Sequence, residues 1–105
     1  MTLMEQIQQI DRRVKAMLRE TSLDELDREE LHTLKQLKLH CNEARLDVRE
    51  YEYAETRVEQ QKAAAKAHRN LAKLEKNILH LSGVFGPADT ADLGAHIDTL
   101  KTALS

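Results

Sequence analysis

Five histidines and one cysteine are the side chains whose types could bind a metal or attack a substrate. On a helix, Glu29 and His32 would form one Glu-x-x-His pair, a motif that a di-iron helical bundle uses twice. No other histidine has a glutamate three residues before it, so the second pair is missing. His40 and Cys41 are adjacent and would point about 100° apart on a helix, with no second pair spaced for zinc. The sequence therefore predicts no metal centre.

The sequence also gives no support for a nucleophilic residue or for a phosphate-binding loop. Cys41 stands between Leu37 and Ala44 in an apolar helical series, so we expect a small core residue rather than a reactive thiol. The segment Gly83-Val84-Phe85-Gly86 lacks the Lys-Ser/Thr pair and the preceding strand of a phosphate-binding loop. We predict no enzyme activity and no cofactor.

The sequence predicts only helices, so helices must position these side chains. The chain has 105 residues, which is the size of one domain, and only 3% of them are aromatic. Its three glycines and one proline all lie in 83–94, so the first 82 residues contain no strong helix breaker. We predict an all-α fold in a single domain over 1–105, either a helical hairpin or bundle or a coiled-coil-like structure.

Helix boundaries follow from apolar spacing and from caps. A first helix over about 3–20 has one apolar face, formed by Leu3, Ile7, Ile10, Val14 and Met17. Ser22 and Glu25 fit a capping box, which predicts a new helix from about 23. Gly83 suits the left-handed end of that helix near 82. A turn over 83–89 and a last helix over about 90–104, capped by Asp89 or Thr90, complete the prediction.

The long segment 23–82 carries two apolar series that are out of phase by two residues. The first series includes Leu34 and Val48, and the second includes Ala67 and Ile78. On one straight helix this shift rotates the apolar stripe by roughly 200°. Either the helix breaks near 59–62, or one long central helix meets different partners on different faces. Because we find no glycine, proline or cap there, we favour a continuous helix flanked by two short ones.

Charge patterning predicts that this exposed middle pairs with a second copy. The segment 23–60 has 11 acidic and six basic residues, whereas 61–82 has five basic and one acidic. Glu52 with Arg69, Glu55 with Lys66, and Glu59 with Lys62 are symmetric about a point after Gln60. An antiparallel homodimer would match acid to base. Its predicted interface comprises Val48, Tyr51, Glu52, Ala54, Glu55, Val58, Glu59, Lys62, Ala63, Lys66, Ala67 and Arg69.

These patterns favour a non-catalytic adaptor or assembly protein that acts through helical surfaces on an unidentified protein partner. The alternative is a small nucleic-acid-associated regulator that uses a basic strip, namely Lys62, Lys66, Arg69, Lys73 and Lys76. A third class is an enzyme or metal carrier built across a dimer interface. The single cysteine and the absence of a signal peptide predict a cytoplasmic location, and we expect no membrane association.

Overall fold

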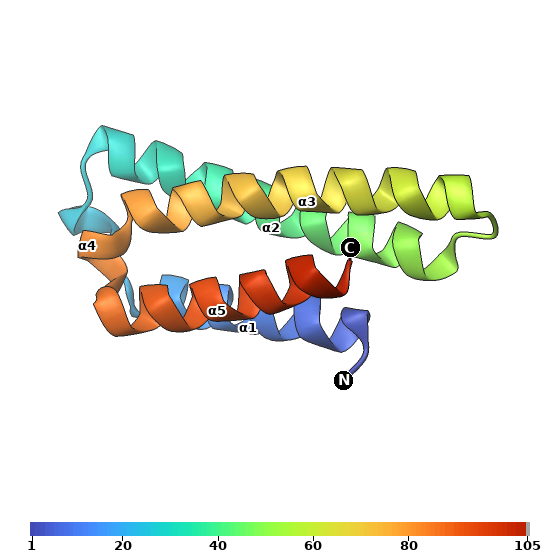
Figure 1. The fold of residues 1–105 in the computed structure, drawn as a ribbon. Helices are drawn as coiled ribbons and strands as arrows, with labels where there is room; N and C mark the ends of the chain where they lie inside the picture. The colour runs from blue at the N-terminus through green and yellow to red at the C-terminus, as the bar shows by residue number, and fades with distance from the viewer. Residues whose placement is uncertain (105) are drawn as a thin grey trace.

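Four main helices form an all-α bundle in the computed structural model, which describes residues 1–104 (Figure 1). No strand occurs in that range. A 3₁₀ turn, η1, joins the first two helices, and a short helix, α4, joins the last two. The elements are α1 (Leu3–Glu20), η1 (Leu23–Glu25), α2 (Arg28–Tyr53), α3 (Arg57–His80), α4 (Ser82–Phe85) and α5 (Pro87–Ala103).

Helix α1 has the predicted bounds and the predicted apolar face. Thr2 caps its start, because the backbone N–H of Glu5 donates to the Thr2 Oγ1 at 3.1 Å. Ile7 and Ile10 are fully buried, and Val14 is nearly so. This face packs against α2, as expected for a first helix that folds back on the chain that follows it.

The prediction of one continuous helix over 23–82 is wrong. The chain turns at 54–56, and α2 and α3 pack against each other as an antiparallel hairpin. The reversal brings the two apolar series to a single core, whereas a straight helix would leave both uncovered. Thr56 caps α3, because its Oγ1 accepts the backbone N–H of Glu59 at 3.1 Å.

The start of α2 also differs from the prediction. Ser22 makes no side-chain cap, and the residues after it form only η1. The capping box lies five residues later. There the Glu30 N–H donates to Asp27 Oδ1 at 2.8 Å, and the Asp27 N–H donates to Glu30 Oε1 at 3.0 Å. Both sites have a small polar residue followed three positions later by glutamate, and only one begins an α-helix.

The connection to α5 is shorter than predicted. Helix α3 ends at His80, and Gly83 lies inside α4 instead of ending the long helix. The left-handed backbone falls on Gly86, which has a φ of 90°. Pro87 occupies the first turn of α5, where its missing N–H costs nothing. The last helix therefore begins at 87 rather than 90.

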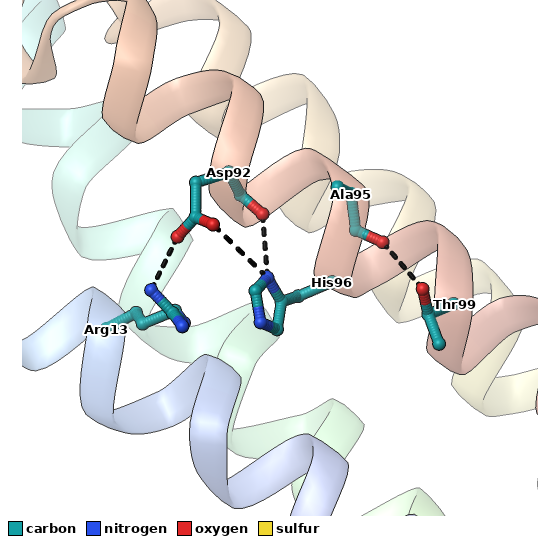
Figure 2. A network of polar contacts seen from close by, with 5 residues as sticks. All are labelled: Arg13, Asp92, Ala95, His96 and Thr99. Carbon is teal, nitrogen blue, oxygen red and sulfur yellow. Dashed lines mark hydrogen bonds and ion pairs between the residues drawn. The ribbon is translucent and has the colours of Figure 1, made fainter.

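The bundle has two layers, the α2–α3 hairpin and the α1–α5 pair (Figure 1). Ion pairs join neighbouring helices at the rim. Lys101 of α5 contacts Glu75 of α3, and Figure 2 shows Arg13 of α1 at the carboxylate of Asp92 on α5. The His96 Nδ1 lies 2.8 Å from the Asp92 carbonyl oxygen. The hairpin helices are longer than α1 and α5, and the turn end of the hairpin extends past the start of α1 and the end of α5 (Figure 1).

Candidate interaction surfaces

The predicted dimer interface divides into buried and exposed residues. Val48, Ala63 and Ala67 are at most 2% exposed and pack inside one chain, so they are not available to a second copy. Tyr51 and Ala54 are half-buried. The remaining predicted interface residues are exposed, namely Glu52, Glu55, Val58, Glu59, Lys62, Lys66 and Arg69.

The three charge pairs predicted to be symmetric about a point after Gln60 do not lie along one helix. Glu52 lies on α2 and Glu55 in the turn, so neither extends the line of α3 as a straight helix would require. Acid and base instead meet within one chain, because Lys66 Nζ of α3 lies 3.2 Å from Glu50 Oε2 of α2. One ion pair thus joins the acidic segment 23–60 to the basic segment 61–82 within the hairpin. The antiparallel register predicted for two straight helices is wrong for this fold.

The basic strip predicted for an anionic partner is continuous in the structure. All five cations lie on α3, and all five are exposed. These are Lys62, Lys66, Arg69, Lys73 and Lys76. Of these, Lys66 also pairs with Glu50.

The histidines do not converge on a metal site. Glu29 and His32 line a cavity of about 660 Å³ between the start of α2 and the end of α3, together with His80. Within 1–104, no group of three or more His, Cys, Asp or Glu side chains could hold a metal ion. His40 instead joins α2 to α3, because its Nδ1 lies 2.7 Å from Asn77 Oδ1.

Cys41 is a core residue, as the apolar series predicts, and is 2% exposed. Burial, together with the nearby Asp11 carboxylate, raises the pKa of its thiol to about 12. The Sγ donates to Asp11 Oδ1 at 3.7 Å. A thiol with this pKa stays protonated near neutral pH and is a poor nucleophile. The groove beside it, between α1 and α2, has a volume of about 450 Å³ and a cationic rim that includes Arg19 and Lys38.

Sequence reasoning missed one buried carboxylate. Asp47 of α2 is 7% exposed, and its Oδ2 accepts the Nδ2–H of Asn70 on α3 at 2.6 Å. Burial raises the pKa of the Asp47 carboxyl, and the hydrogen bond from Asn70 opposes part of that rise. The signal was present in the sequence, because Asp47 directly precedes the core residue Val48. Its partner lies on another helix, so the pairing needed the hairpin.

Sequence reasoning also missed most of an exposed apolar surface on the hairpin. Leu39, Leu46 and Tyr53 of α2 are 46%, 48% and 75% exposed, and Val58 and Leu79 of α3 are 61% and 65% exposed. They lie on what we call the outer face of the hairpin. It is formed by Lys35, Leu39, Asn42, Leu46, Arg49, Tyr53, Val58, Lys62, Ala65, Arg69, Ala72, Lys76 and Leu79.

Comparison with protein families, curated proteins and solved structures finds no match to this chain. Within the described residues, no helix combines the length and apolarity needed to cross a bilayer.

Proposed function

We propose that this chain is a non-catalytic helical interaction or assembly protein that acts through the α2–α3 hairpin. One observation carries the proposal. Among the described residues, seven large apolar side chains are exposed, and five of them lie on the outer face of the hairpin. Exposed apolar residues scattered singly are ordinary, whereas their concentration on one face is typical of a protein contact.

The polar groups between helices support a structural rather than a catalytic role. The Asp47–Asn70 and His40–Asn77 contacts each join α2 to α3 inside the hairpin. Asp47 and His40 are engaged in these contacts within the hairpin and join its two helices.

Self-association is the first contact that we propose. Glu52, Glu55 and Glu59 surround the turn end of the hairpin, and the basic strip follows along α3. Two copies related by a two-fold axis would place each acidic end against the other copy's basic strip. Only the exposed members of the predicted interface take part in this arrangement.

Light scattering coupled to size exclusion tests this pairing. At about 10 mM salt, where the Debye length is about 30 Å, we expect twice the monomer mass of 12.0 kDa. At about 1 M salt, where the Debye length is about 3 Å, we expect the mass to fall towards 12.0 kDa. A mass of 12.0 kDa at both salt concentrations contradicts the dimer.

A matched pair of variants locates the contact. The double change Glu52→Lys and Glu55→Lys reverses charge at the turn end of the hairpin. Asp24→Lys with Glu25→Lys makes the same charge change on η1, where both acids are also exposed. We expect the first variant to be monomeric at low salt and the second to remain dimeric.

Nucleic-acid binding is the second candidate function, and the placement of all five basic-strip residues on one exposed helix favours it. We expect binding of a labelled duplex of about 20 base pairs to weaken roughly 10²–10³-fold between about 50 mM and 200 mM salt. Fluorescence anisotropy measures this, and Lys66→Glu with Arg69→Glu should abolish binding. No binding at low salt removes this candidate.

A further inference from the structure

The apolar residues of the outer face recur at the spacing of a coiled coil. Leu39, Leu46 and Tyr53 follow one another at intervals of seven residues on α2. On α3, Val58 and Leu79 are three intervals of seven apart, with the exposed Ala65 and Ala72 between them. Seven residues complete nearly two helical turns, so each series keeps to one side of its helix. The hairpin therefore presents two apolar stripes along its length.

Both stripes point away from the core. Leu39 and Leu46 each lie two positions before a buried residue, Cys41 and Val48. Ala65 and Ala72 bear the same relation to the buried Ala67 and Leu74. Two positions correspond to roughly 200° around a helix. Helices α1 and α5 lie together on one side of the hairpin (Figure 1). The stripe residues are exposed and point away from the core, so these two helices leave them uncovered.

The charges of the outer face all have one sign. On α3, Lys62, Arg69 and Lys76 stand four residues after Val58, Ala65 and Ala72 and repeat the seven-residue interval. On α2, Lys35 and Arg49 add two more cations, and the Arg49 guanidinium lies 6.0 Å from the centre of the Tyr53 ring. None of the outer-face residues is acidic. Glu43 and Glu50 lie beside this face, towards the seam with α3, where Lys66 pairs with Glu50.

We propose that the outer face binds an acidic amphipathic helix of another protein, lying along the hairpin. Apolar residues of that helix would pack against the two stripes, and the aspartates or glutamates on its α3 side would face Lys62, Arg69 and Lys76. The stripe from Val58 to Leu79 spans about 32 Å at 1.5 Å per residue, so a partner helix of about 20 residues covers it. This inference rests on the proposed function and names the partner's chemistry.

Other occupants fit this face less well. A second copy laid outer face against outer face would oppose its five cations to the same five, which disfavours that arrangement. The proposed dimer instead brings the acidic turn end to the basic strip. A nucleic-acid backbone would satisfy the cations and leave Leu39 and Leu46 in water. An anionic membrane surface would match the apolar residues and the cations without requiring the seven-residue interval. A helix matches the spacing, the apolar residues and the charge together.

The test uses the full chain and a fluorescein-labelled peptide of three heptads, with leucine at the a and d positions and glutamate at e and g. A scrambled peptide of the same composition keeps the charge and loses the spacing. By fluorescence anisotropy, we expect the heptad peptide to bind at least about tenfold more tightly than the scrambled one, since tenfold in affinity corresponds to about 1.4 kcal/mol.

Matched variants distinguish the face from the rest of the surface. Leu46→Glu and Arg69→Glu should each weaken binding of the heptad peptide by about tenfold or more. Leu23→Glu on η1 and Arg12→Glu on α1 make the same changes at exposed positions elsewhere, and we expect them to bind like the native chain. Circular dichroism confirms that each variant is folded. Should Leu46→Glu unfold, Leu46→Ser replaces it.

Each of the following outcomes would overturn this inference. Equal binding of the heptad and scrambled peptides means that charge alone acts, and equal losses in the control variants mean that the face is wrong. Binding of the chain to vesicles of phosphatidylcholine and phosphatidylserine, without peptide binding, assigns the face to anionic membranes. If the peptide fails to bind while the chain still dimerises, only the partner chemistry is wrong. If neither occurs, the proposed function fails with it.

Discussion

Leu71→Ala is expected to lower the free energy of unfolding by about 2–5 kcal/mol, the usual range for a buried leucine replaced by alanine. Leu71 is fully buried on α3 and packs in the single core shared by the four main helices. Because domains of this size are stable by only about 5–15 kcal/mol, the loss would be a large fraction of the total. Urea denaturation followed by circular dichroism measures it.

Leu79→Ala is the matched control, because it removes the same atoms from the same helix. Leu79 is 65% exposed, and we expect a change within about 0.5 kcal/mol. The difference in stability between the two variants shows which side of α3 faces the core. If Leu79→Ala is as destabilising as Leu71→Ala, then α3 does not direct its Leu71 side towards the core, and the outer face as we define it does not exist.

Asn70→Ala is expected to destabilise the protein by about 1–3 kcal/mol at neutral pH, the usual cost of leaving a buried polar group unsatisfied. The change removes the amide that donates to Asp47 Oδ2 at 2.6 Å. Asp47 is 7% exposed, so water cannot readily replace the lost donor. Asn42→Ala on the exposed side of α2 is the control, and we expect its effect to stay within about 0.5 kcal/mol.

The cost of Asn70→Ala should shrink as the pH falls. Burial raises the folded-state pKa of Asp47 above its ordinary value of 3.8, with Asn70 opposing the rise. Between the raised pKa and 3.8, the folded chain binds a proton that the unfolded chain does not, so acidification makes the contribution of Asp47 more favourable. Protonated Asp47 depends less on the Asn70 donor. Unfolding measured at about pH 7 and about pH 4 checks this. An equal cost at both pH values would contradict the assignment.

The N-terminal helix shows how much apolar spacing alone can determine. The prediction for 3–20 matches α1 at both ends, because its five apolar residues repeat at steps of three and four without interruption. At the start of α2, the capping signals in the sequence do not single out one residue. Ser22 with Glu25 and Asp27 with Glu30 have the same cap spacing, and only the second pair caps α2. The cap spacing alone does not distinguish the two sites.

The hairpin shows where local signals were misread. The two-residue phase shift indicated either a break or a change of partner, and we favoured the continuous helix. The structure has the break at 54–56, which precedes the range 59–62 that the alternative prediction gives for it. Thr56 and Glu59 have the spacing of a capping box, and Thr56 does cap α3. Without a glycine or proline, this cap was the only local mark of the turn.

The sequence by itself determined the all-α class, the apolar faces of α1 and α3, the burial of Cys41 and the continuity of the basic strip. These features depend on spacing within one helix, which the order of residues sets directly. Only the tertiary structure decided that α2 and α3 reverse into a hairpin, that Asp47 meets Asn70, and that Val48, Ala63 and Ala67 are buried within one chain. Those outcomes depend on contacts between distant segments, because a helical face becomes core or surface only when another helix covers it.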